Sequence, residues 1–527
     1  MAGDCCARLP DMQVSSEQVL QSQPVYQSAH SKARGVLILG AVLVAFPWLW
    51  PLNLGPMPQM LPNLVAWSCG ALLLGLWWWL RDGFDKVLAA GVLLAATLNA
   101  LIALLQYFDW ESMFVPWIAS SRPGEAFGNV QQRNLLASLL CMGLVSLDYL
   151  VRRDRMWHSL RWSLGAILIL ALAATSSRTG FMHIMLLTVL TVFWRRDEGR
   201  RIWLQAGALL LAYLLASVLM PMLLHWATGL RIDDLMARFL TDYQCASRRV
   251  IWSNMLELAA LRPLTGWGAG ELLFAHYITD YEGPRACIKL AHAHNLFLHW
   301  AVIWGWPLTA LLTAAMILAL THCRPWAAKC SRGRFAWALL ALMGAHSLVE
   351  FPMWYGWFQV VALCAGVLLV QSNMKRRTSD ASGYTTSSRW RLPVLLTGSA
   401  ALLTAFGLIA MDYFKASQPY LPLHMRPEYY RVDTLKRIQD TVLFQSHVIV
   451  AGVVSTPVTP SNAQVMLAAA QEALHTAPDS RIIRQLLIAA SFLGRDDLVA
   501  LHTRQYAAAW PNEYREWQAM NGLAPEK

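Results

Sequence analysis

Charged residues are scarce in this sequence. Only 14% of the 527 residues are Asp, Glu, Lys or Arg, whereas an ordinary soluble domain carries about 25%. Apolar residues make up 56% of the chain, and 25 residues are tryptophan. These values exclude a disordered chain, a coiled coil and a small disulfide scaffold, and they argue against a soluble globular enzyme. The composition therefore predicts a polytopic membrane protein.

Eleven apolar stretches are candidates for membrane-spanning helices, since roughly 20 apolar residues cross the hydrocarbon layer. Their apolarity is continuous, whereas the strands of a membrane barrel alternate between apolar and polar residues. We therefore expect an all-α polytopic membrane bundle of about 11 transmembrane helices, seven in 34–224 and four in 296–411. The expected spans are 34–50, 62–80, 87–106, 134–151, 161–176, 179–194, 202–224, 296–321, 335–349, 352–373 and 392–411.

Lysine and arginine are absent from the connection 51–61, and this asymmetry predicts the orientation. Every second connection carries arginines or lysines, on the same side as the N-terminus, and positive residues stay cytoplasmic. Residues 1–33 lack an apolar stretch of signal-peptide type, so we expect a cytoplasmic N-terminal segment and an uncleaved first span. Segments 107–133, 225–295 and 412–527 then lie on the outer side of the membrane. These membrane flanks also explain the net charge of +11, so no nucleic-acid partner is expected.

Two outer regions carry most of the sequence outside the spans. The periplasmic loop 225–295 is mixed in composition, and the C-terminal domain 412–527 has apolar residues at helical spacing. Paired helices of tetratricopeptide type would fit this domain, although it has no convincing repeat. Cys245 and Cys287 are the one cysteine pair of the outer loop, and an oxidising envelope would allow a disulfide between them. No CxxC motif indicates zinc or thiol redox chemistry.

Five polar clusters lie where the predicted outer connections meet the spans, and polar residues there need a reason because their burial is costly. In the first, Asn129 or Asn134 could cap a helix, but capping does not require Gln132 as well, so recognition of a polar ligand stays open. In the second, Arg178 could extend to the interface or bind a phosphate oxygen pair.

The third and fifth clusters combine arginine, carboxylate and aromatic side chains. Arg248 stands four residues before Trp252, so both can share a helix face. The glycine pattern of 266–270 is typical of a plain turn. In the fifth cluster, an aromatic interface belt would explain Tyr355, but it does not explain Glu350.

The fourth cluster holds His292 and His294, just before the eighth expected span. A metal site with His299 is disfavoured, because these residues are badly phased on a helix and no acidic or cysteine partner has a familiar spacing. Two interpretations remain, a structural interface histidine or proton transfer in catalysis. All five clusters face the same predicted side, which favours an active site at the outer membrane–water boundary.

The order of these motifs resembles the bacterial O-antigen ligase/polymerase superfamily. His294-Asn295, followed by nine residues and Gly305, resembles its H-N-x9-G signature. Further segments resemble the branch that glycosylates proteins, the pilin O-oligosaccharyltransferases. These are GNVQQRN at 128–134, SRTG at 177–180, the stretch from Arg248 to GWGAG at 266–270, HSLVEFPMWY at 346–355 and MRPEYYR at 425–431.

The resemblance implies a donor glycan on an undecaprenyl-diphosphate carrier and an acceptor Ser or Thr of a pilin or another exported protein. It implies that no metal, nucleotide sugar or other cofactor takes part. The functional positions of the family correspond to His294 for the essential histidine, Gln132 and Tyr355 for catalysis, and Arg178 and Arg248 or its neighbour Arg249 for the diphosphate. Beside these positions, the polar clusters offer four candidate supporting residues, Asn134, His292, Asn295 and Glu350.

Elementary chemistry agrees with these roles. Glycosyl transfer breaks a C1–O bond to a diphosphate, and two arginines at a low-dielectric boundary would stabilise the growing negative charge. His294 would act as general base on the attacking hydroxyl, an effect worth roughly 10²–10⁴-fold. Attack opposite the leaving group would invert the anomeric centre.

Two other functions stay open. A ligase to lipid A–core or an O-antigen polymerase would use related chemistry, and the C-terminal domain 412–527 is the feature that discriminates between acceptors. A transporter of lipid-linked sugars would need polar or broken spans near the bilayer midplane, whereas the polar residues gather at one face here. We expect an enzyme of the bacterial inner membrane, surrounded by lipid, with its active site facing the periplasm.

Overall fold

The structure is a computed structural model of the 527-residue chain, and it describes residues 23–231, 245–378 and 391–520. Within these ranges every regular element is helical, as the sequence predicts, and no strand occurs. Most of the predicted cytoplasmic segment 1–33 and residues 232–244 of the predicted periplasmic loop lie outside the described residues.

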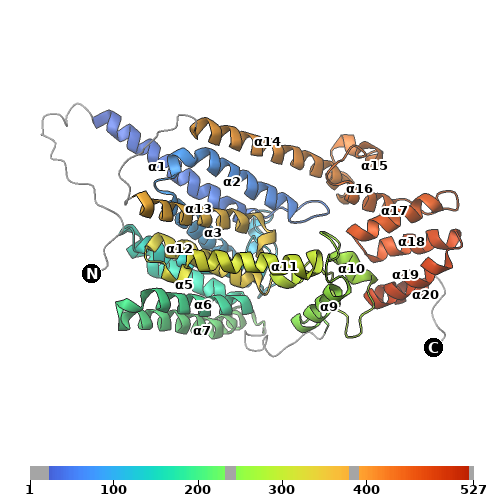
Figure 1. Cartoon of the computed structure of the whole chain (residues 1–527), viewed down its shortest axis with the longest axis horizontal. Helices are drawn as coiled ribbons and strands as arrows, with labels where there is room; N and C mark the ends of the chain where they lie inside the picture. Colours follow the sequence, from blue (N-terminus) through green and yellow to red (C-terminus); the bar gives the residue numbers. More distant parts are fainter. Residues whose placement is uncertain (1–22, 232–244, 379–390, 521–527) are drawn as a thin grey trace.

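Long helices run side by side along the long axis of the molecule (Figure 1), and each expected span falls on one of them. They are α1 (Gln23–Ala45), α2 (Met60–Leu80), α3 (Phe84–Tyr107), α4 (Arg133–Val151), α5 (Met156–Ala174), α6 (Arg178–Arg195), α7 (Arg200–Thr228), α11 (Leu296–Cys323), α12 (Ser331–Ser347), α13 (Gly356–Thr378) and α14 (Arg391–Ser417).

Seven of these helices, α2, α3, α4, α5, α7, α11 and α14, are long and apolar enough to cross a membrane. The chain is therefore a multi-pass membrane protein. Two shorter apolar helical segments are Arg34–Leu49, in α1 and η1, and Gly356–Ser372, in α13. The count of about 11 spans stays a prediction, and so does the orientation.

The core of the bundle lies around α3 and α4. α3 packs against α1, α4 and α5, and its small residues Ala89, Ala96 and Ala100 are fully buried. Opposite them, a Cβ added at Gly143 of α4 would lie 2.4 Å from the Ala96 Cβ. Small residues at this contact let the two backbones approach closely, as is typical of helices packed in a membrane. α14 lies at the periphery against α2.

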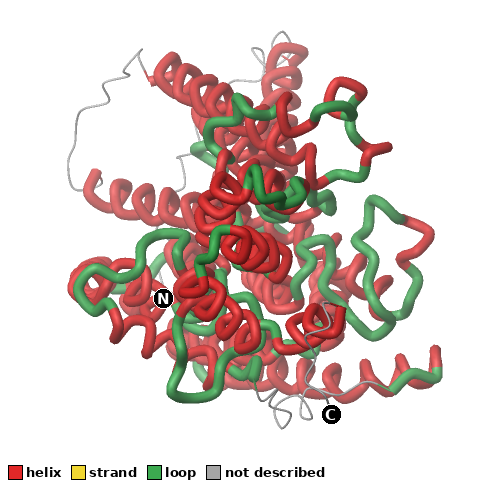
Figure 2. Tube along the Cα trace, turned by 90° about the vertical axis from the view of Figure 1, so that its right-hand side faces the viewer, coloured by secondary structure: helices red, strands yellow, loops and turns green. Residues whose placement is uncertain are grey.

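The remaining helices gather at one end of the bundle, which Figure 2 views end-on. Tyr277 of α10 joins the apolar core of the C-terminal helices, in which α16, α17 and α18 pack on one another. The predicted tetratricopeptide-like pairing stays a prediction. The α-helices are α9 (Arg248–Leu261), α10 (Leu272–Ile278), α15 (Thr434–Arg437), α16 (Gln445–Ser455), α17 (Ala463–Thr476), α18 (Ser480–Phe492), α19 (Asp496–Ala509) and α20 (Pro511–Met520).

Short 3-10 helices complete the connections between the α-helices. They are η1 (Phe46–Leu49), η2 (Glu111–Phe114), η3 (Arg196–Glu198), η4 (Pro325–Ala327), η5 (Pro352–Trp354), η6 (Gln418–Tyr420), η7 (Leu423–Met425) and η8 (Glu428–Tyr430).

α11 is interrupted at Gly305, the glycine of the H-N-x9-G signature. Its φ of +80° favours glycine, and a Cβ there would lie 2.4 Å from the carbonyl oxygen of Leu264. Across the break, the N–H groups of Trp267 and Gly268 donate to carbonyls of α11 at 2.8 and 3.0 Å. The glycine pattern of 266–270 is therefore more than a plain turn, because it joins the end of α9 to the broken helix.

Candidate active site

Glu350 lies at the centre of a polar cluster between helix ends. Its side chain is 5% exposed, and its backbone N–H donates to the carbonyl of His346, near the end of α12, at 2.8 Å. The carboxylate accepts hydrogen bonds from Arg248 and, at 3.2 Å, from Asn134 Nδ2. Its Oε2 lies 2.8 Å from His294 Nδ1. A buried carboxylate needs such partners, so Glu350 brings together residues that are far apart in the sequence.

The contact with Glu350 decides which nitrogen of His294 carries a proton. A carboxylate only accepts hydrogen bonds, so Nδ1 is the donor, and a neutral ring then offers Nε2 as an acceptor. The side chain is 16% exposed, and the ring lies against Phe351 with ring centroids 5.0 Å apart. His294 can therefore accept a proton from a hydroxyl group that approaches Nε2.

Three helices near Glu350 begin with the same backbone turn. The residue before each N-cap has a left-handed φ: +57° at Gln131, +46° at Ser176 and +52° at His294. The N-caps that follow are Gln132 for α4, Ser177 for α6 and Asn295 for α11. Left-handed backbone is uncommon outside glycine, costs of order 1–3 kcal/mol and is concentrated at functional sites. The turn places His294 beside Glu350 while Asn295 starts the helix.

Gln132 itself caps α4, whereas the sequence suggested Asn129 or Asn134. Its Oε1 accepts a hydrogen bond from the N–H of Leu135 at 2.6 Å. Asn129 instead donates to two loop carbonyls, each at 2.8 Å. Asn134 lies inside the first turn of α4, so its side chain can reach Glu350 and also accept a hydrogen bond from the cap of α6 at 2.7 Å.

The arginines differ in what they contact. Arg248 is the first residue of α9; its side chain is 33% exposed and donates to Glu350. Burial lowers the pKa of Arg248, Glu350 opposes this shift, and the nearby charge of Arg178 adds to it. Arg178 and Arg249 are exposed. Of the two adjacent arginines, Arg248 is thus the one that lies within the cluster, with Arg178 close enough to repel it.

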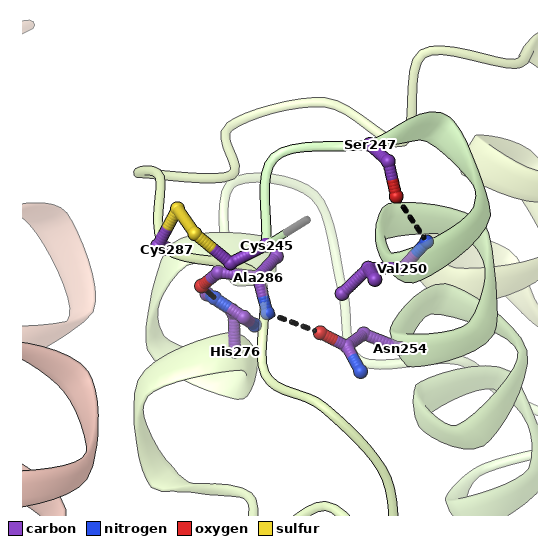
Figure 3. Close-up of a disulfide and its surroundings, with 7 residues drawn as sticks. All are labelled: Cys245, Ser247, Val250, Asn254, His276, Ala286 and Cys287. Carbon is purple, nitrogen blue, oxygen red and sulfur yellow. Dashed lines mark hydrogen bonds between the residues drawn. A yellow bond between two sulfur atoms is a disulfide. The ribbon is translucent and has the colours of Figure 1, made fainter. Parts of the chain in front are cut away.

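A disulfide joins Cys245 to Cys287 just before α9 (Figure 3). Ser247 caps the helix by accepting a hydrogen bond from a backbone N–H at 3.3 Å. One turn further along, Asn254 Oδ1 accepts a hydrogen bond from the N–H of Ala286 at 2.8 Å. These links hold the N-terminus of α9, and with it Arg248, against the segment that leads to His294.

His292 and His299 pack against aromatic rings beside the cluster. The His292 ring lies 4.1 Å from the rings of both Phe351 and Trp354, between centroids. Burial lowers the pKa of His292 to about 3, and the neighbouring His299 and His294 lower it too. A neutral His292 fits a packing role. In the described part of the chain, no three His, Cys, Asp or Glu side chains are grouped as metal ligands.

Tyr355 and Gln132 lie next to this cluster and line a cavity of about 170 Å³. The ring of Tyr355 stacks on Phe351 with centroids 6.2 Å apart, and Phe351 also contacts His294. The structure thus brings His294, Arg248 and Asn134 into contact with Glu350. Tyr355 lies one aromatic ring away, and Gln132 lines the same cavity as Tyr355. Asn295 ties α11 to the turn before Glu350 by donating to the carbonyl of Leu348 at 3.0 Å.

The sequence analysis missed a buried polar group inside the bundle. Ser138 Oγ lies 2.7 Å from His346 Nδ1 and 3.4 Å from His183 Nδ1, and all three residues are fully buried. Ser138 follows Asn134 by one turn of α4, so this group continues the cluster into the bundle. The sequence did contain a signal for this group, because His183 and His346 both lie inside predicted spans. Histidine is rare in a membrane span unless it has a role there.

Sequence models of three families match different parts of the chain. One described as "O-Antigen ligase" matches residues 163–313, one described as "Protein glycosylation ligase" matches 126–151, and one described as "Virulence factor membrane-bound polymerase, C-terminal" matches 334–523. Together these matches include most of the residues of the cluster around Glu350.

Two curated proteins of Acinetobacter baylyi are similar to the chain. A general O-oligosaccharyltransferase is 23% identical over 323 residues, which are 57% of this chain and 56% of the relative. A ComP-specific O-oligosaccharyltransferase is 22% identical over 342 residues, 64% of this chain and 60% of the relative. The similarity thus spans little more than half the length of these relatives.

The chain thus combines a helical membrane fold with sequence similarity to O-antigen ligases over residues 163–313. Over residues 126–151 the chain resembles protein glycosylation ligases, and at low identity it is similar to two O-oligosaccharyltransferases.

Proposed function

We propose that this protein is an oligosaccharyltransferase that moves a glycan en bloc from an undecaprenyl-diphosphate carrier to a Ser or Thr hydroxyl of a pilin or another exported protein. The observation that carries the proposal is the contact of His294 and Arg248 with one buried carboxylate, Glu350. A proton acceptor and a cation for a diphosphate lie side by side at helix ends, as the reaction requires.

The reaction uses the residues of the cluster as follows. The acceptor hydroxyl attacks C1 of the first sugar while its proton passes to His294 Nε2. The C1–O bond to the diphosphate breaks, and its electron pair stays on the diphosphate oxygen. Arg248 and Arg178 stabilise this charge. Attack from the opposite face inverts C1. Glu350 keeps Nδ1 protonated and stabilises the imidazolium that forms.

Further residues orient the two substrates. Gln132 and Tyr355 line the neighbouring cavity and bind polar groups of sugar or acceptor. Asn134 supports Glu350, His292 packs beside the base, and Asn295 holds the helix that follows it. The chain's own residues supply the base and the cations, so the proposed reaction uses no metal. The site lies in the inner membrane at its periplasmic face, with the N-terminus in the cytoplasm.

The test is transfer by the purified full-length protein in detergent, with an undecaprenyl-diphosphate-linked glycan and a pilin acceptor. The intact mass of the pilin should rise by the mass of the whole glycan. His294→Ala should lower the rate by roughly 10²–10⁴-fold, whereas His322→Ala, an exposed histidine at the other end of α11, should not. Full activity of a folded, membrane-inserted His294→Ala protein would refute the assignment of the base.

A second candidate is transfer to lipid A–core or to a growing O-antigen, because the O-antigen ligase and polymerase models also match the chain. Offering pilin and lipid A–core together in the same assay separates the two, since only the true acceptor gains the glycan. A transporter would leave both acceptors unmodified.

A further inference from the structure

A cavity of about 170 Å³ opens between the connection that follows η1 and the start of α4. It is far larger than the roughly 10–15 Å³ that one water needs. Three aromatic rings and five side-chain amides form most of its wall, and none of its described lining residues carries a charge. The lining residues are Trp50, Asn53, Pro58, Gln59, Pro62, Asn129, Val130, Gln131, Gln132, Tyr355 and Trp357.

We propose that this cavity is a subsite for an uncharged sugar ring of the donor glycan; the proposal rests on the transfer function proposed above. Sugar rings present apolar C–H faces, which suit the negative faces of aromatic rings. Their hydroxyls both donate and accept hydrogen bonds, and a side-chain amide offers both kinds of group without charge. A diphosphate or an acidic peptide would instead require cations, and these lie outside the cavity.

Several of the amides retain unused hydrogen-bonding capacity. An amide can make up to four hydrogen bonds. Asn129 makes three, all to backbone groups, so it is part of the wall. Gln59 bonds to Tyr355, and the amides of Asn53 and Gln131 pair with each other. Gln59 and Asn53 are exposed at the cavity and can therefore bind a ligand in addition.

Hydrogen bonds from α14 hold the connection that carries Asn53 and Gln59. The Tyr413 hydroxyl lies 2.5 Å from the carbonyl of Leu54 and 2.8 Å from that of Met57. Gly55 packs against the same helix with a φ of +78°, where a Cβ would overlap a side chain of α14. On the other side, Gln131 donates to a carbonyl of the connection at 2.7 Å. The amides therefore stand in place before a ligand arrives.

The position of the cavity suits the sugar that undergoes transfer. Tyr355 and Gln132 belong both to its wall and to the surroundings of the cluster at Glu350. When C1 lies at His294 with the diphosphate at Arg248, a sugar ring can extend past Phe351 into the cavity. The subsite then selects donors by their glycan, whereas the arginines bind the diphosphate that every such donor shares.

The experiment measures binding, and it uses the full-length protein in detergent. Dissociation constants are determined for the glycan-bearing carrier and for bare undecaprenyl diphosphate. The wild type should bind the glycan-bearing carrier more tightly. Asn53→Ala and Gln59→Ala should each weaken binding of that carrier by about tenfold, the effect of a lost hydrogen bond or two, and leave binding of the bare carrier unchanged. Met57→Ala, an exposed side chain of the same connection outside the cavity, is the matched control and should bind both carriers as the wild type does.

The subsite would be overturned by equal affinity of the wild type for both carriers, or by unchanged affinity of both variants for the glycan-bearing carrier. If the variants raise the KM for the acceptor and leave carrier binding unchanged, the cavity binds the acceptor, and the donor subsite is overturned. Transfer is scored separately with the pilin acceptor. If the variants lose glycan-dependent binding, the subsite is supported, whether or not the wild type transfers the glycan. If the wild type transfers nothing to the pilin, only the proposed transfer function is refuted.

Discussion

At the scale of single residues, Glu350 explains how His294 and Arg248 can lie in the same partly buried site. Its carboxylate balances Arg248 and orients His294 at the same time. Desolvation makes an isolated buried charge very costly, so each partner depends on the others. Loss of this carboxylate is therefore expected to impair the functions of both His294 and Arg248.

Glu350→Gln should show this dependence. The amide keeps the shape but removes the charge, so Arg248 is left without its counter-charge and the His294 ring loses the group that stabilises its protonated form. We expect kcat to fall by roughly tenfold to a hundredfold and the donor KM to rise. Steady-state kinetics of the purified protein measures both. Glu472→Gln, an exposed carboxylate of α17, should change neither.

His276 should make the outer loop sensitive to acid. Burial lowers its pKa to about 3, and the nearby charge of Arg285 contributes. Between the unfolded pKa near 6.5 and the folded value, only the unfolded chain binds this proton, so stability falls as the pH falls. At pH 5 the loss is about 2 kcal/mol relative to pH 7. The unfolding midpoint of His276→Gln should depend less steeply on pH than that of the wild type; equal slopes would contradict the assignment.

At the scale of elements, the break of α11 explains the glycine of the H-N-x9-G signature. The helix opens at Gly305 so that the segment after α9 can bond to its exposed backbone groups. This joint sets the distance between the N-termini of α9 and α11, which carry Arg248 and His294. The signature therefore combines a chemical residue with the glycine that makes its placement possible.

Gly305→Ala should disturb this joint. A methyl group would overlap the carbonyl of Leu264, and the left-handed backbone costs a non-glycine residue of order 1–3 kcal/mol. We expect a lower unfolding midpoint and greatly reduced transfer. Gly207→Ala in α7 has open space around it and should leave both unchanged. A Gly305→Ala protein with normal stability and activity would show that the joint does not matter.

At the same scale, the disulfide between Cys245 and Cys287 stabilises the loop that carries α9. It joins two cysteines that are 42 residues apart and closes a loop that contains α9 and α10, and such a link typically contributes about 2–4 kcal/mol. A double variant, Cys245→Ser with Cys287→Ser, should unfold more easily and bind the donor more weakly, because Arg248 follows the link directly. Thermal unfolding and donor affinity check this, and a Cys69→Ser variant, a buried free cysteine of α2, controls for the loss of a thiol.

At the scale of the whole molecule, α9 and α10 lie between the long helices of the bundle and the C-terminal helices (Figure 1). The hydroxyl of Tyr277 in α10 lies 2.9 Å from His502 Nδ1 in α19, and Glu271 lies 2.7 Å from His475 of α17. The C-terminal helices are thus anchored on the loop that carries Arg248. An acceptor protein bound to them would stand near the cluster.

The predicted orientation can be tested by labelling cysteines in intact cells with a membrane-impermeant maleimide. A cysteine placed by Ser461→Cys, exposed in the C-terminal domain, should react from outside. Cys323, exposed at the C-terminal end of α11, should react only after the inner membrane is permeabilised. The reverse pattern would place the cluster at Glu350 on the cytoplasmic side and exclude the proposed reaction.

The sequence by itself determined the helical membrane bundle, because continuous apolarity permits little else in lipid. It also indicated the motifs that surround His294, Arg248 and Glu350, since polar residues at span ends are costly without a role. Only the tertiary structure decided that Glu350 joins the other two, that Gln132 rather than Asn129 caps α4, and that a cavity lies beside Tyr355. These features depend on side chains from segments far apart in the chain, and local periodicity carries no information on how such segments approach one another.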